Sequence, residues 1–207
     1  MPRCRPHRYS LVRARSIPLA LALLRLVRPA VLLLAPALVV APHLVAASGP
    51  VEDFKVKAAM VFHFTSFISW PEVAFEQSDS LLVLGIINDP ALESALREIV
   101  RGETVGGRPL AVVRCRTIDD AREAHLVYVS RTEAAHLQAI LTGLGDRPIV
   151  TVGEFAHFAE RGGMIELGGR TGGRVSLRIN PDALKARNLS ASSKLLRLAE
   201  IVSSPQP

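Results

Sequence analysis

Apolar runs of strand length alternate with helical patterns along most of this chain. The strand-like runs are SLLVLGIIN (80–88), GGRPLAVVRC (106–115), HLVYV (125–129) and RPIVTV (147–152), and helical patterns occupy 91–100, 134–144 and 154–162. Parallel strands need long crossover connections, and their sequences are apolar because both faces of the sheet are buried. The alternation therefore predicts an α/β fold with a mostly parallel sheet and crossover helices.

Helix-start signals support these boundaries. Thr117 with Asp120, and Ser130 with Glu133, have the spacing of capping pairs, and Asp89 is a natural N-cap. Asp89 also follows a strand, where ligand sites of open parallel sheets form. The capping role alone is sufficient to explain an aspartate at position 89.

The pattern changes in GGMIELGGRTGGRVSLRIN, residues 162–180. Glycine pairs bracket two short strands, and the second of them alternates apolar and polar residues. Such alternation indicates one buried and one wet face, so we expect an antiparallel hairpin at the sheet edge. A closing helical region starts at Asn180, is interrupted near Asn188 and resumes over 192–202. With no linker or repeat, residues 48–207 are expected to form a single α/β domain.

The first 47 residues resemble a signal peptide. They contain seven arginines and no acidic residue, then an apolar stretch that ends in LVAAS. Small residues at Val45 and Ala47 fit cleavage after Ala47 and export to the periplasm. The alternative is an uncleaved membrane anchor, which Pro29, Pro36 and Pro42 disfavour as a stable spanning helix.

The charge of the chain does not predict a nucleic-acid partner. The formal net charge is +6, but removal of the seven leader arginines leaves 18 basic and 19 acidic residues. The basic excess therefore belongs to the leader rather than to a binding surface.

No enzyme or metal motif is present. The chain lacks the glycine-rich dinucleotide motif, the P-loop and the nucleophile elbow, and its histidines are too widely spaced for a metal pair. We therefore expect no catalytic residue, metal or cofactor. GGRTGGR (168–174) could bind an anion through Arg170 and Arg174, although a simple hairpin turn explains it as well.

An aromatic segment precedes the first strand. VKAAMVFHFTSFISWP (56–71) contains the single tryptophan, and apolar residues at three- and four-residue steps predict an amphipathic helix that Pro71 ends. Phe62 and Phe64 point about 200° apart on a helix, so they cannot share one face. One face should pack on the sheet, and Phe64 or Phe67 either extends that core or contacts a dimer or signalling partner. Trp70 should anchor the helix end, with its indole N–H bonded.

These segments together resemble the YfiR family of periplasmic proteins. The resemblance rests on VKAAMVFHFTSFISWP, GGMIEL (162–167), VSLRIN (175–180) and NLSASSKLLRLAEIV (188–202), and it covers residues 53 to about 202. It implies a Rossmann-like three-layer α/β fold, a homodimer and no catalysis. It also implies repression of a membrane-bound diguanylate cyclase through that enzyme's periplasmic portion, which lowers cyclic di-GMP and restrains biofilm formation.

Related domains also occur in histidine kinases, so a kinase is an alternative partner. The candidate contact residues are Met164, Ile165, Arg170 and Arg174 in the hairpin, and Phe64 and Phe67 in the first helix. A second hypothesis is a periplasmic small-ligand sensor with a pocket at the strand ends or beside the hairpin.

The cysteine content departs from the best understood family members, which contain cysteine pairs linked to redox control. After removal of the leader, only Cys115 remains. Intramolecular redox control is therefore not expected. Cys115 is either a buried apolar residue at a strand end or a partner for a cysteine of another chain.

Overall fold

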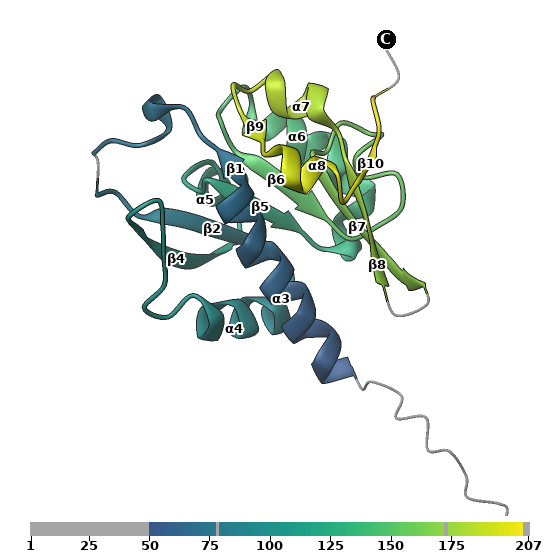
Figure 1. Ribbon diagram of the computed structural model, residues 1–207, viewed down its shortest axis with the longest axis horizontal. Helices are drawn as coiled ribbons and strands as arrows, with labels where there is room; N and C mark the ends of the chain where they lie inside the picture. Colours follow the sequence, from purple (N-terminus) through teal and green to yellow (C-terminus); the bar gives the residue numbers. More distant parts are fainter. Residues whose placement is uncertain (1–49, 78, 172–173, 205–207) are drawn as a thin grey trace, which may run out of the picture. The chain divides into compact units, whose positions relative to one another are not determined.

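The computed structural model describes residues 50–77, 79–171 and 174–204. The expected signal peptide, residues 1–47, lies outside this range. In chain order the described elements are α3 (Pro50–Phe67), β1 (Ile68–Ser69), the 3-10 helix η1 (Glu72–Ala74), β2 (Leu82–Ile87), α4 (Pro90–Ile99), β3 (Thr104–Val105), β4 (Arg108–Cys115), α5 (Ile118–Arg122), β5 (Leu126–Val129), η2 (Arg131–His136), α6 (Leu137–Leu144), β6 (Val150–Gly153), β7 (Ile165–Thr171), β8 (Arg174–Ile179), α7 (Pro181–Lys185), β9 (Ser190–Ala191), α8 (Ser193–Leu196) and β10 (Glu200–Ile201) (Figure 1).

An eight-stranded sheet forms the centre of the domain, in the order β10-β8-β7-β6-β5-β2-β4-β3. The five strands β4, β2, β5, β6 and β7 run parallel, and β8 runs antiparallel to β7. This confirms the α/β class and the mostly parallel sheet. The order of the parallel strands, counted along the chain, is 2-1-3-4-5, which is one of the two common doubly wound orders.

Helices cover both faces of the sheet. One core joins apolar residues of α3, α4, α7 and α8 to one face, and a second core joins α5 and α6 to the other. Strands β5 and β6 are buried along their whole length because they have neighbours on both edges and both faces.

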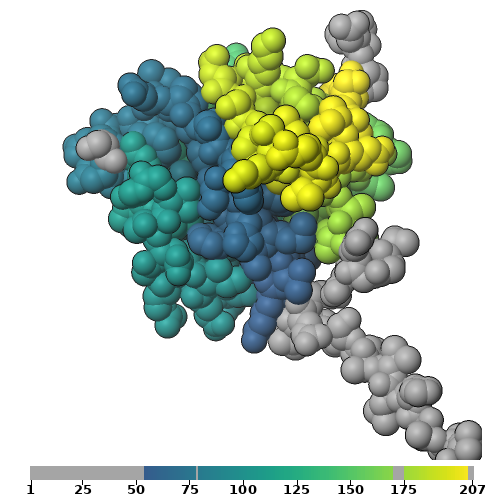
Figure 2. All heavy atoms as spheres, in the orientation of Figure 1, coloured from purple at the N-terminus to yellow at the C-terminus, as the bar shows by residue number. Residues whose placement is uncertain are grey.

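The aromatic helix α3 buries one face against the sheet. Ala58, Val61 and Phe64 are at most 3% exposed and follow each other at three-residue steps. The helix ends at Phe67 rather than at Pro71, because Ile68 and Ser69 pair antiparallel with Ala191 and Ser190. Figure 2 shows the yellow C-terminal segment packed beside this dark-blue helix.

Two of the helices predicted from the sequence differ in the structure. Residues 154–162 make a series of turns, in which His157 has a φ of 64°, a conformation incompatible with a continuous right-handed helix. The closing region 192–202 contains only the short helix α8 and then β10. Strand β10 pairs parallel with the outer side of β8, so the β7–β8 pair does not form the edge of the sheet.

Within residues 50–77, 79–171 and 174–204, no helix is both long enough and apolar enough to cross a bilayer.

Candidate functional site

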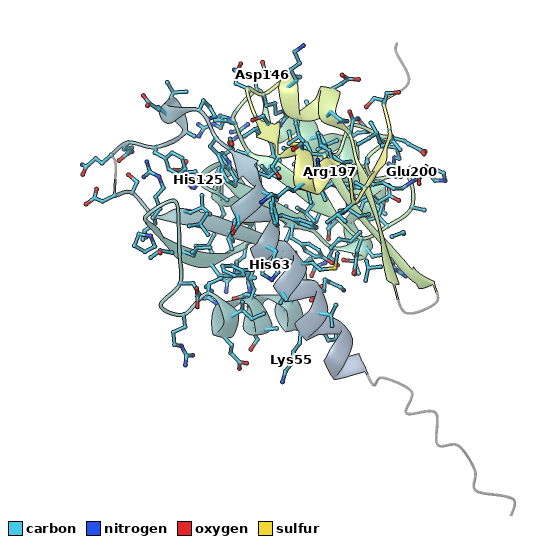
Figure 3. The ribbon with its side chains drawn as sticks, in the orientation of Figure 1. Lys55, His63, His125, Asp146, Arg197 and Glu200 are labelled. Carbon is cyan, nitrogen blue, oxygen red and sulfur yellow. The ribbon has the colours of Figure 1, made fainter. Side chains whose placement is uncertain are left out.

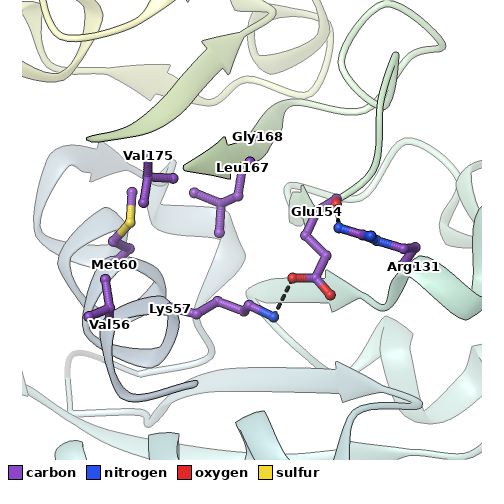
Figure 4. A pocket seen from close by; sticks show the side chains of 9 residues that line it. Val56, Lys57, Met60, Arg131, Glu154, Leu167, Gly168 and Val175 are labelled. Carbon is purple, nitrogen blue, oxygen red and sulfur yellow. Dashed lines mark hydrogen bonds and ion pairs between the residues drawn. The ribbon is translucent and has the colours of Figure 1, made fainter. Parts of the chain in front are cut away.

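A pocket of about 230 Å³ lies where α3 faces β7 and the residues that follow β5 and β6. Arg131 is the first residue of η2, two positions after the end of β5, and Glu154 comes directly after β6. Ligand sites of open parallel sheets form at the carboxyl ends of strands. The lining residues are Val56, Lys57, Met60, Arg131, Glu154, Leu167, Gly168, Gly169 and Val175 (Figure 4).

An ion pair between Lys57 and Glu154 crosses this pocket. Figure 4 shows Lys57 reaching from α3 to the Glu154 carboxylate, with Arg131 on the other side of Glu154. The two side chains of the pair are 19% and 18% exposed, so solvent screens the pair less than it would a surface pair. The Arg131 guanidinium donates a long hydrogen bond of 3.4 Å to the backbone carbonyl of Glu154.

The buried hydroxyl of Tyr128 lies close to this ion pair. It has no hydrogen-bond partner among the described residues. Burial raises the pKa of Tyr128, and the carboxylates of Glu154 and Asp89 raise it further. Tyr128 therefore stays protonated, and the Glu154 carboxylate is the nearby acceptor toward which its hydroxyl can donate.

The β7 side of the pocket contains an irregularity in strand pairing. The register between β7 and β8 shifts between Leu167 and Arg170, so Gly168 and Gly169 form a bulge. A Cβ on Gly168 would lie 1.8 Å from Ser176 Oγ, whereas a Cβ on Gly169 would have no neighbour within 4 Å. A side chain at 168 would therefore require the Ser176 hydroxyl to move, and glycine at 169 keeps space open at the pocket.

A second pocket of about 570 Å³ adjoins the first and shares Arg131, Glu154 and residues 167–169 with it. Its centre is Arg178, whose guanidinium lies 3.1 Å from Glu160, 3.6 Å from Glu166 and 3.1 Å from Glu200. Hydrogen bonding to Glu200 raises the pKa of Arg178. This cluster fixes β10 to β8 and β7, and its three carboxylates against one guanidinium leave it with a formal net charge of −2.

The topological switch point lies between β2 and β5, because the connections that leave these strands pass to opposite faces of the sheet. Asn88, at a φ of 56°, donates from its amide to Thr132 Oγ1 at 3.0 Å and to Glu133 Oε1 at 2.9 Å. These two bonds connect the residue after β2 to the segment after β5, across the switch point. Asp89 caps α4 by accepting from the Leu92 N–H at 2.9 Å, which confirms its expected structural role.

His125 lies just before β5, at the amino ends of the parallel strands and away from the pocket at their carboxyl ends. Figure 3 labels it on the other side of the view from Glu200. Its Nδ1 accepts from the Val83 N–H at 3.1 Å, so the hydrogen is assigned to Nε2, which donates to the Ala74 carbonyl at 3.0 Å. Phe75 stacks on the imidazole at 4.6 Å, and Arg108 stacks on Phe75. These contacts hold the loop before β2 in place, so the cluster has a structural role.

The expected contact residues divide into three groups. Met164, Ile165 and Phe64 were expected at a partner surface, but they are only 1%, 0% and 3% exposed. They pack instead in the core formed by α3 and the sheet. Phe67 is half-buried and packs against that core. Arg170 and Arg174 lie in the paired ends of β7 and β8, and their side chains lie outside the described part of the chain.

Four residues of the site were not predicted from the sequence: Lys57, Tyr128, Arg131 and Glu154. Arg131 and Glu154 could have been found, because each comes two residues after the end of a strand of the expected parallel sheet. Lys57 gave no such signal, since its place in the pocket depends on how α3 crosses the sheet. The described residues contain no group of three or more histidine, cysteine or acidic side chains arranged to hold a metal ion.

Comparison with known proteins identifies one family. A family model described as YfiR/HmsC-like matches residues 54–200. Among solved structures, the crystal structure of a conserved domain protein from Vibrio cholerae O1 biovar El Tor strain N16961 is similar, with 14% identity and a TM-score of 0.46. The match covers 72% of this chain and 59% of the Vibrio chain, so it spans about three fifths of that protein's length. No curated protein matches.

Proposed function

This chain belongs to the YfiR/HmsC-like family, and from that premise we propose that it is a periplasmic regulator that represses a membrane-bound diguanylate cyclase. The repressor would bind the periplasmic portion of the cyclase and lower cyclic di-GMP, which restrains biofilm formation. The observation that carries this proposal is the family match over residues 54–200, which extends from α3 to β10. A histidine kinase with a periplasmic segment is the alternative partner.

The four segments that resemble the family are close together in the fold. β1, at the end of the first segment, pairs with β9 in the last, β7 pairs with β8, and β8 pairs with β10. They therefore form one connected half of the domain. This proximity supports a shared structural role for the segments.

We place the docking surface at the end of the β7–β8 hairpin. Arg170 pairs with Val175 and Thr171 pairs with Arg174, so both arginines lie in the last described pairs of β7 and β8. Arginine is enriched at the centres of protein interfaces. Phe67 is a further candidate, because it is only half-buried. Met164, Ile165 and Phe64 are not part of this surface.

Co-purification from membranes tests this proposal. The exported protein, used as bait, should retain a membrane protein with a periplasmic segment and a cyclase or kinase domain. Charge reversal in Arg170→Glu/Arg174→Glu should weaken that capture, whereas the control Arg101→Glu/Arg197→Glu, at exposed arginines elsewhere, should not. Equal capture by both variants would exclude the hairpin as the docking surface and direct attention to Phe67.

The pocket beside α3 favours a second candidate function, a small-ligand sensor. It lies both at the strand ends and beside the hairpin, and it combines apolar and charged lining residues. Mass spectrometry of the protein under native conditions tests this function, since a sensor with a tight ligand should retain added mass after purification.

Residues 1–47 would be a signal peptide and residues 48–207 a single YfiR-like domain with a Rossmann-like three-layer arrangement and a C-terminal antiparallel hairpin. The protein would act as a homodimer by protein contact, without catalysis, cofactor or metal.

A further inference from the structure

The pocket beside α3 has apolar and charged lining residues. The apolar ones are Val56, Met60, Leu167 and Val175, and the charged ones are Lys57, Arg131 and Glu154. Glu154 is already neutralised by Lys57. Among the residues that the structure describes, Arg131 makes only the long bond to the Glu154 carbonyl. The pocket therefore carries a net charge of about +1 located at Arg131.

We infer that this pocket binds a small organic anion with one carboxylate and an apolar body. The planar guanidinium of Arg131 matches a carboxylate, with which it can form two parallel hydrogen bonds. The apolar body would lie against Leu167 and Val175. The volume of about 230 Å³ is below the roughly 300–1,000 Å³ of pockets for drug-sized ligands, so the ligand would have only a few carbon atoms.

Two further features suit such a ligand. Gly169 leaves open space at the pocket, because no atom lies within 4 Å of the position of a Cβ. The buried Tyr128 hydroxyl lies near the Glu154 carboxylate and can donate toward it, which further offsets the one acidic side chain of the pocket.

Nuclear magnetic resonance with sodium hexanoate as the probe tests the inference. Titration into the ¹⁵N-labelled purified protein should shift the amide resonances of Glu154, Gly168 and Gly169 until they saturate. Hexylamine, which has the same carbon chain and the opposite charge, should not do so at equal concentration. Arg131→Gln should raise the apparent Kd at least tenfold, and Gly169→Phe should remove saturable binding by filling the pocket.

The matched control is Arg101→Gln, which removes an exposed arginine in the turn after α4 and should bind hexanoate as the wild type does. The inference is overturned if hexanoate causes no saturable shift at these amides, if hexylamine binds equally, or if Arg131→Gln keeps wild-type affinity. The inference rests on the ligand-sensor function proposed above and does not depend on cyclase repression. Failed hexanoate binding with intact partner capture would reject the ligand class and leave the proposed regulation standing.

Discussion

Trp70 donates its indole N–H to the backbone carbonyl of His125 at 3.1 Å, across 55 residues of sequence. Trp70 lies just after β1, and His125 lies just before β5. The bond therefore connects the end of the aromatic segment to the amino end of a central strand. The His125 carbonyl is thus the hydrogen-bond acceptor that the partly buried indole N–H of the only tryptophan in the chain requires.

The first prediction concerns this tryptophan. Because Trp70 is only half-buried, Trp70→Ala should cost about 2–3 kcal/mol, less than the roughly 3–5 kcal/mol of a fully buried tryptophan. Trp70→Phe keeps most of the packing and should cost about 1 kcal/mol for the lost hydrogen bond. Urea unfolding followed by circular dichroism measures both values. A change below about 1 kcal/mol for Trp70→Ala would contradict an anchoring role.

The second prediction concerns pH. Burial lowers the pKa of His125 below its usual 6.5, and Arg108 lowers it further, although the bond to the Ala74 carbonyl opposes this. Between the folded pKa and 6.5 the unfolded chain binds a proton that the folded protein does not. The stability that His125 contributes is therefore fully present above pH 6.5 and falls as the pH drops toward the folded pKa, by at most about 1.4 kcal/mol per unit.

His125→Asn should reduce this pH dependence, since asparagine can accept from the Val83 N–H without titrating. The control is His63→Gln, at an exposed position on α3. Urea unfolding from pH 7.5 to pH 5 measures the slope. If the slope is equal in the wild type and in His125→Asn, the histidine does not control it.

The third prediction concerns Cys115. It is 4% exposed, and burial, together with the nearby Asp120, raises the pKa of its thiol to about 11. Only about one thiol in ten thousand is then ionised at pH 7, and the thiolate is the reactive form. The folded protein should react slowly with a disulfide reagent, form no covalent dimer and keep its Tm in reducing agent. Rapid labelling without denaturant would show that Cys115 is accessible.

The fourth prediction concerns Asn180, which is fully buried. Its amide donates to the Ala159 carbonyl and to Ser204 Oγ, both at 2.9 Å, and its oxygen caps α7 by accepting from the Ala183 N–H. Asn180→Ala should cost about 2–3 kcal/mol, because it leaves buried polar groups unpaired. Thr117→Ala removes an exposed cap and should cost about 1 kcal/mol. Equal losses in chemical denaturation would show that burial of Asn180 adds nothing.

Local patterns in the sequence predicted the parallel strands and several helix caps. Thr117 and Asp120 form the expected capping box, whereas of the expected Ser130–Glu133 pair only Ser130 caps η2, and Glu133 accepts from Asn88 instead. These features depend on neighbouring residues, so composition and spacing are sufficient to find them.

Features that depend on distant residues were not predictable in this way. The early end of α3 results from pairing of Ile68 with Ala191, more than 120 positions away. Likewise, Lys57 meets Glu154 only because α3 crosses the carboxyl end of β6. Strand β10 is two residues long and lay within an apparent helical pattern, because its pairing with β8 outweighs local propensity.

Cellular cyclic di-GMP, measured after deletion of the gene, tests the proposed repression most directly. The account predicts a rise on deletion and a return to the original level when the full chain is supplied. A chain without residues 1–47 should not restore repression, because it would not reach the periplasm. An unchanged level on deletion, or full restoration by the chain without its first 47 residues, would contradict a periplasmic repressor of a membrane diguanylate cyclase.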